Sequence, residues 1–206
     1  MKKRDFFNKL FDNGISYEKY AEQSSSHVER MEDSWFASQA AVKGLSQDHI
    51  ARLNEKLRVL CIAENWCGDC ANAVPVIAKL ANEISNWDFR IVSRDLFNNE
   101  VEMFYTTAGR KKIPVIIFAD EDGDEIMRWI ERPTRSYHLL GMLRDQNLPK
   151  EEFLEKYNNT PDFQPPTVSK EILGELIGVA DKAASILRNH PPKRKRPTIN
   201  TLVSRH

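Results

Sequence analysis

The stretch from residue 57 to residue 84 constrains the fold of this 206-residue chain most, because it joins two hydrophobic patterns through a cysteine pair. Residues 57–63 are short and almost wholly apolar, which predicts a buried strand. From Val74 to Ile84 apolar residues recur at helical spacing, which predicts a helix. Between the two patterns stands Trp66-Cys67-Gly68-Asp69-Cys70. The junction therefore places Cys67 at a helix N-terminus, where unpaired backbone N–H groups and the helix dipole favour a thiolate.

The remaining segments predict one mixed sheet with helices on both of its faces. Further strands are expected at residues 88–93, 114–118 and 125–130, the last two joined by the turn signal Asp122-Gly123. Helical patterns fill residues 1–56, where Ser46 caps the third segment, and recur at 100–107, 134–147, 150–157 and 172–187. The order β-α-β-α-β-β-α over residues 57–147 indicates the α/β fold class.

Composition and charge argue against several classes of function. Six basic and no acidic residues lie from Arg188 onward, so residues 1–187 carry 24 basic against 30 acidic residues and a formal charge of −6. This body offers no net attraction to nucleic acid or to anionic membranes. The N-terminus lacks the apolar core of a signal peptide, and no apolar run has the length of a membrane span. We therefore expect a cytoplasmic protein, in which a Cys-x-x-Cys pair is catalytic or metal-binding.

Three features of the sequence occur together. Residues 64–70 are Glu-Asn-Trp-Cys-Gly-Asp-Cys, Pro75 follows Cys67 by eight residues, and Ile113-Pro114 opens a later strand. In combination they resemble the thioredoxin-like family, and most of all the bacterial members that carry WCGDC in place of WCGPC. The resemblance covers residues 57–147 and implies a thioredoxin fold with a mixed four- to five-stranded sheet. The expected regions are an N-terminal helical extension packed on the core (1–56), a thioredoxin-like domain (57–147), a C-terminal helical extension (148–188) and a basic, disordered tail (189–206).

The resemblance also implies roles for individual residues. Cys67 matches the exposed nucleophile and Cys70 the buried resolving thiol, so a redox-active Cys67–Cys70 disulfide is the only cofactor expected, with no metal. Trp66 matches the aromatic residue beside the active site, and Gly68 lies between the thiols. Pro114 matches the proline that follows a cis peptide bond, which lays the backbone of Ile113 beside the cysteines for pairing with a substrate strand.

Other positions depart from thioredoxin. Asp69 replaces a proline, and its charge is expected to raise the pKa of Cys67 by repulsion of the thiolate. Cys61 stands where thioredoxin buries an aspartate that assists the resolving thiol, and Glu64 is a candidate to replace that carboxylate. A glycine of thioredoxin's last strand region is absent, and Glu131-Arg132-Pro133 stands near that place.

These observations predict a thiol–disulfide oxidoreductase that reduces disulfides of proteins or small molecules, with electrons from a reductase or a thiol pool. No nucleic acid and no membrane is expected as a partner. The main alternative is a thioredoxin-fold interaction module without significant redox turnover. Half of a zinc site is a second alternative, for which Cys61 and five scattered histidines supply no second ligand pair. The basic run Pro191–Pro197 fits a solvated tail or, alternatively, a nuclear-localisation or nucleic-acid patch.

Overall fold

A computed structural model describes residues 2–190 of the chain, and the expected basic tail from residue 191 onward lies outside these residues. The strands are β1 (Leu57–Ala63), β2 (Trp87–Ser93), β3 (Val115–Ala119) and β4 (Glu125–Ile130). The helices are α1 (Lys3–Asp12), α2 (Tyr17–Glu22), α3 (Val28–Lys43), α4 (Gln47–Leu53), α5 (Gly68–Glu83), η1 (Asp95–Phe97), α6 (Asn98–Phe104), α7 (Thr134–Arg144), α8 (Lys150–Asn159), η2 (Pro161–Phe163) and α9 (Thr167–Asn189). Each strand and helix predicted from the sequence is present, although α9 begins five residues before the predicted start at residue 172.

The strands form one mixed four-stranded sheet in the order β2-β1-β3-β4. β1 pairs in parallel with β2, with Cys61 opposite Ile91, and antiparallel with β3, with Cys61 opposite Ile116. β3 and β4 form the predicted hairpin, in which Gly123 adopts a φ of +90° that a residue with a side chain rarely takes. The four-stranded mixed sheet with helices on both faces confirms the predicted fold class.

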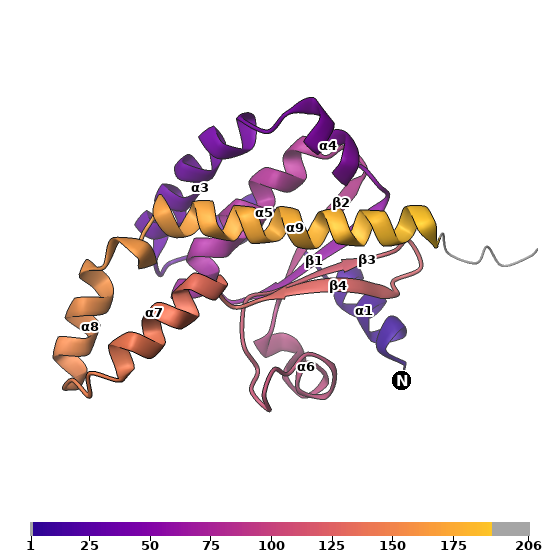
Figure 1. The fold of residues 1–206 in the computed structure, drawn as a ribbon. Coiled ribbons are helices and arrows are strands. Elements are labelled where there is room, and N and C mark those ends of the chain that lie inside the picture. The colour runs from indigo at the N-terminus through magenta and orange to yellow at the C-terminus, as the bar shows by residue number, and fades with distance from the viewer. Residues whose placement is uncertain (1, 191–206) are drawn as a thin grey trace, which may run out of the picture.

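Helices cover the sheet unequally on its two faces (Figure 1). α3, α5 and α9 lie on one face, and α1 and α6 lie on the other. α5 lies against β1 and β2, α9 lies beside it against β3 and β4, and α3 packs on both helices from the outside. This position explains why α5 is apolar on nearly all sides, since a helix covered on every face needs no polar stripe. Pro75 lies within α5 without ending it, and the structure brings the N-terminus of this central helix to the end of β1.

The N-terminal segment is attached to the core by its apolar face and by one strand bridge. Phe6, Phe7, Leu10 and Phe11 are fully or almost fully buried, as their shared helical face predicted. Ile15 exchanges two backbone hydrogen bonds with Ile91, which covers part of the edge of β2. Ser46 accepts a hydrogen bond from the backbone N–H of His49 and so caps α4 as predicted.

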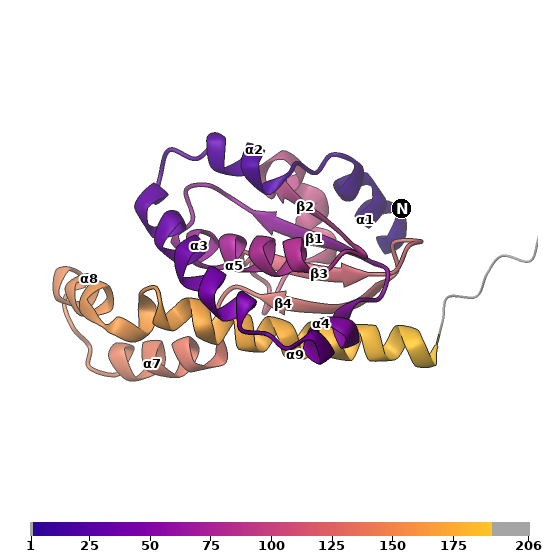
Figure 2. The ribbon, with the colours of Figure 1, turned by 90° about the horizontal axis from the view of Figure 1, so that it is seen from above.

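The helices α7 and α8 project beyond the sheet as a hairpin (Figure 2). Leu140, Leu143 and Phe163 form a small hydrophobic cluster of their own at this hairpin. The main core, in contrast, is continuous from Phe6 in α1 to Ala183 in α9. No helix within residues 2–190 is both long enough and apolar enough to cross a membrane.

Candidate active site

Cys67 is the residue at which the end of β1 turns into α5. Its backbone is extended (φ −94°, ψ 117°), so it serves as the N-cap of the helix. The Cys67 Sγ accepts a hydrogen bond from the backbone N–H of Cys70 at 3.3 Å. A hydrogen bond with the Cys70 side chain is the largest influence on Cys67 and lowers its pKa, and the Cys70 N–H acts in the same direction. Burial and the Asp69 charge oppose this shift without cancelling it.

Cys70 lies one turn further along α5 and is fully buried. Burial raises the pKa of the Cys70 thiol well above its ordinary value, and the adjacent Cys67 adds to the effect. Cys61 is equally buried in the middle of β1, and its pKa is also raised by burial. The three cysteines thus include one partly accessible thiol, Cys67, in front of two inaccessible ones.

Ile113 and Pro114 face the cysteine pair from the loop before β3. The peptide bond between them is cis, as the resemblance implied. The Ile113 carbonyl oxygen lies 3.8 Å from the Cys67 Sγ, close enough for the thiol to donate a weak hydrogen bond. The Pro114 carbonyl accepts a hydrogen bond of 2.7 Å from the backbone N–H of Glu131, which follows β4. The structure therefore brings Cys67 and Ile113, which are 46 residues apart in the sequence, into one site.

Trp66 forms the open side of this site. Its side chain is 49% exposed, and the Arg94 guanidinium lies 5.0 Å from the centre of its ring. Arg94 is held in turn by the Asp95 carboxylate, at 2.7 and 2.9 Å, and by the Lys111 carbonyl. An exposed indole with an anchored cation behind it leaves a flat surface beside Cys67 that is accessible to a substrate.

Asp69 lies on the opposite, closed side and is not a free charge. Its carboxylate forms an ion pair with Arg132, and each side chain is less than one-fifth exposed. Burial raises the pKa of Asp69, and Arg132 works against that rise. Asp69 does oppose the thiolate of Cys67 as expected, but the pKa of Cys67 is nevertheless lowered.

Further charged groups surround Arg132. Its guanidinium also contacts the Glu131 carboxylate, which accepts hydrogen bonds from Lys112 and from the Tyr137 hydroxyl. Burial acts against the charged form of Glu131, but these donors outweigh it and lower the pKa of Glu131. Glu131 has a φ of +60°, in the left-handed region that glycine adopts most easily. Near the place where thioredoxin carries a glycine, this chain thus has a residue with a side chain in a backbone conformation that glycine adopts most easily.

Glu64 directly follows β1 and is mostly buried, but its contacts point toward β2. Its Oε1 accepts hydrogen bonds from the Ser93 hydroxyl at 2.7 Å and from the backbone N–H of Asp95 at 2.8 Å. These bonds fasten the segment that carries Arg94 to the end of β1. No hydrogen bond between the Glu64 carboxylate and a cysteine is present among the described residues.

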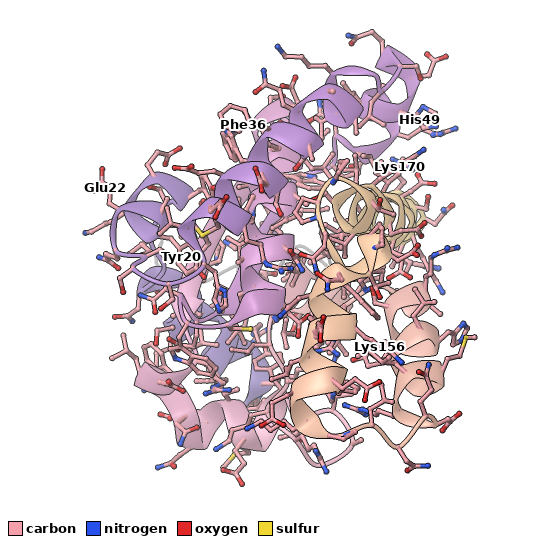
Figure 3. The ribbon with its side chains drawn as sticks, turned by 90° about the vertical axis from the view of Figure 1, so that its left-hand side faces the viewer. Tyr20, Glu22, Phe36, His49, Lys156 and Lys170 are labelled. Carbon is pink, nitrogen blue, oxygen red and sulfur yellow. The ribbon has the colours of Figure 1, made fainter. Side chains whose placement is uncertain are left out.

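Two further side chains approach the cysteine pair from the N-terminal region, where no sequence pattern indicated a site. The Tyr20 hydroxyl is buried and has no hydrogen-bond partner within residues 2–190, and burial together with the nearby Cys70, Cys61 and Cys67 raises its pKa. The His27 ring lies close to Gly68: a Cβ atom added to Gly68 would be 3.7 Å from the ring, in van der Waals contact with it. Figure 3 faces the end of the molecule at which Tyr20 is labelled on α2, with α3 next to α2 and Lys156 of α8 on the other side of the view.

The geometry therefore joins a cysteine pair at the start of a central helix to a cis-proline loop on a four-stranded mixed sheet, which defines a thioredoxin-like protein. Within residues 2–190, no three His, Cys, Asp or Glu side chains gather in a way that would hold a metal ion.

Comparison with known proteins gives the same result. A family model described as thioredoxin matches residues 14–158, and the chain belongs to this family. A crystal structure of a protein of unknown function, PA1234 from Pseudomonas aeruginosa, is similar with a TM-score of 0.60 at 17% identity, covering 85% of this chain and 97% of that one. An HIV epitope-scaffold is similar with a TM-score of 0.55 at 17% identity, covering 84% and 95%. Both likenesses concern the fold alone, and no curated protein matches the sequence.

Proposed function

We propose that this protein is a thiol–disulfide oxidoreductase that reduces disulfides through Cys67 and Cys70. The observation that carries the proposal is the contrast between the two thiols. Cys67 is partly accessible, caps a helix and has a lowered pKa, whereas Cys70 is buried one turn away with a raised pKa. A nucleophile needs the first environment, and a resolving thiol that must not react prematurely needs the second.

The reaction proceeds by two exchanges at sulfur. The Cys67 thiolate attacks one sulfur of a substrate disulfide, and the S–S bond breaks as the other sulfur leaves as a thiolate that takes up a proton. Cys70 then loses its proton and attacks the Cys67 sulfur, which releases the second substrate thiol and leaves a Cys67–Cys70 disulfide. Two electrons and two protons have passed to the substrate. The Ile113 carbonyl beside the Cys67 Sγ offers a backbone acceptor for an extended substrate segment.

The cycle requires a partner on each side of the reaction. A disulfide-bearing protein or small molecule is the substrate, and a reductase or a small-thiol pool returns two electrons to the Cys67–Cys70 disulfide. No metal or nucleotide takes part in the exchange itself. A dithiol that works as a reductant belongs in a reducing compartment, and we propose the cytoplasm.

A disulfide-reduction assay with insulin as substrate and dithiothreitol as electron donor tests the proposal. Cys67→Ser is expected to reduce turnover by on the order of 10³-fold or more, because the nucleophile is lost. Reduced Cys70→Ser, mixed with insulin in the absence of dithiothreitol, is expected to accumulate a mixed disulfide at Cys67 that mass spectrometry detects. Cys61→Ala is the matched control, since it removes a buried thiol outside the pair and should retain turnover. Equal rates in the wild type and in Cys67→Ser would refute the proposal.

An interaction module is the second candidate, and one feature of α3 favours it. Phe36 is 68% exposed beside an apolar hollow of about 330 Å³ that is lined mainly by Tyr17, Met31 and Trp35. A large exposed aromatic side chain beside a hollow is typical of contact surfaces. Absence of turnover in the wild-type protein, with both thiols shown to be reduced and intact, would favour this candidate.

A further inference from the structure

We propose that Arg132 is a positioning residue for the Cys67–Cys70 pair, which clamps and balances the Asp69 carboxylate so that the charge inside the motif does not suppress the Cys67 thiolate. The inference rests on the proposed function, because it concerns the reactivity of Cys67 as a nucleophile, which the Asp69–Arg132 ion pair would preserve. It assigns a role to a residue 63 positions away from Asp69 in the sequence.

The first step of the argument is that the ion pair is built into the fold. Asp69 lies in the first turn of α5 and Arg132 lies just beyond β4, so the pair joins the active-site helix to the edge strand. The two side chains are only 19% and 18% exposed. Residues of α7, α8 and α9, including Ser136, Tyr157 and Ile172, enclose the space around them. Water therefore screens this pair far less than it screens an ion pair on the surface.

The second step is that Arg132 is itself held in place. One carboxylate oxygen of Glu131 contacts the guanidinium at 3.2 Å. The other carboxylate oxygen accepts hydrogen bonds from Lys112 and from the Tyr137 hydroxyl. The Tyr137 ring also faces the guanidinium, with 5.6 Å between the guanidinium carbon and the ring centre. A cation fixed in this way keeps one position relative to Asp69, which a mobile surface lysine would not do.

The third step is that Asp69 carries the negative charge that acts on Cys67. Cys70 on α5, Cys61 on β1, Tyr20 on α2 and Tyr157 on α8 also interact with Cys67, and Glu64 after β1 and Lys112 beside Ile113 are the charged groups on the adjoining segments. Burial raises the pKa of Cys70, Cys61 and both tyrosines, so these groups are uncharged near neutral pH. His27, which precedes α3, lies against Gly68. Asp69 is therefore the anionic side chain that bears most directly on the thiolate, and Arg132 is its counter-charge.

A double-mutant cycle tests the balance of the two charges. The four proteins are the wild type, Arg132→Gln, Asp69→Asn and the double variant, each reduced, and the pKa of Cys67 is obtained from the pH dependence of iodoacetamide alkylation at that residue. Arg132→Gln leaves Asp69 unbalanced and should raise the midpoint by about one pH unit, whereas Asp69→Asn leaves Arg132 unbalanced and should lower it by a similar amount. The double variant removes both charges and should return close to the wild type.

The controls separate this role from a structural one. Arg135→Gln removes a nearby arginine whose partner is Asp162, and should leave the midpoint unchanged. Arg132→Lys keeps the positive charge and should shift the midpoint less than Arg132→Gln does. If Arg132→Gln does not fold, the midpoint of Asp69→Asn must still lie below that of the double variant.

An unchanged midpoint in folded Arg132→Gln would overturn the inference, as would a double variant that does not return toward the wild type. Alkylation needs no turnover, so these outcomes are independent of the insulin assay. A protein without disulfide reductase activity would therefore refute the proposed function while the cycle still reports on the charges around Cys67.

Discussion

The two sides of the active-site turn differ in how exposed their side chains are and in which contacts hold them. On the open side, Trp66 is half exposed and Cys67 is partly accessible, and a cation–π contact with Arg94 is the main restraint on the indole. On the closed side, Asp69 and Cys70 are covered, and a network of buried ion pairs holds the carboxylate. From Trp66 to Cys70, five positions thus lead from an exposed surface to a covered interior that holds the charge of Asp69.

Under the proposed function, this difference would let one short motif both contact a substrate and control the charge of a thiolate. Contact with a variable substrate requires exposed apolar surface that adapts, and such surface contributes little to stability. Control of a thiolate requires fixed charges in a place where water does not screen them. The α7–α8 hairpin and α9 provide that place, because residues of all three helices enclose Asp69 and Arg132.

The largest expected effect is the difference in reactivity between the two thiols. With iodoacetamide in excess, the reduced wild type should be alkylated at Cys67 on the order of 100-fold faster than at Cys70, because one thiol is accessible and ionised more easily. A lowered pKa means that the thiolate forms at lower pH, so the Cys67 rate should reach half its maximum at a lower pH than that of free cysteine measured in the same buffers. Mass spectrometry of digested samples distinguishes the sites, and equal rates would remove the distinction between the two sides.

The next effect concerns the stability that the closed side contributes. Arg132→Gln is expected to lower the free energy of unfolding by about 2 to 3 kcal/mol, because a mostly buried carboxylate loses its partner. Arg135→Gln is the matched control, and its loss should be about 0.5 kcal/mol, because Arg135 is 57% exposed. Urea denaturation monitored by tryptophan fluorescence measures both. Similar losses in the two variants would mean that burial of the Asp69–Arg132 pair has no energetic consequence.

Much of the fold was predictable because its signals are local. The run of residues 57–63, the helical spacing after Val74 and the Asp122-Gly123 turn each specify one element without reference to the rest of the chain. The late start predicted for α9 has a physical reason. Thr167 to Glu171 are mostly polar or only partly buried, and the predicted helix began where the apolar spacing becomes regular.

The residues of the candidate site were predictable only where a single short segment of the sequence contains a recognisable pattern. Cys67 and Cys70 are only three positions apart in sequence, and Ile113-Pro114 was identified through the resemblance to the thioredoxin-like family. Arg132 has no such signal, since nothing in an arginine before a proline indicates a partner 63 residues away. The direction of the Asp69 influence on Cys67 was correctly predicted, but its net outcome depends on a hydrogen bond with Cys70 that geometry alone reveals. Long-range pairs of this kind depend on register and packing, which single-residue patterns do not encode.

A smaller effect tests what supports the open side. Glu64→Ala should lower the free energy of unfolding by about 1.5 kcal/mol, since the partly buried Ser93 hydroxyl and the Asp95 N–H lose their acceptor. Glu64→Gln keeps an acceptor oxygen but takes up no proton at neutral pH, and it should change insulin turnover less than about threefold. A tenfold or greater fall in turnover for Glu64→Gln, with stability retained, would instead assign the carboxylate to proton transfer at Cys70.

The smallest effect is expected at Trp66, whose substitution should weaken the binding of the substrate while the free energy of unfolding changes little. Trp66→Ala should raise the KM for insulin by about three- to tenfold while kcat stays within twofold, because the indole contributes contact area and no chemistry. The free energy of unfolding should change by less than about 1 kcal/mol, since the side chain is 49% exposed and loses mainly its contact with Arg94. Trp66→Phe is the matched variant, because it keeps an aromatic ring for Arg94 and should recover most of the KM. A loss of stability as large as that of Arg132→Gln would show that the open side is also part of the core, and the contrast between the two sides would fail.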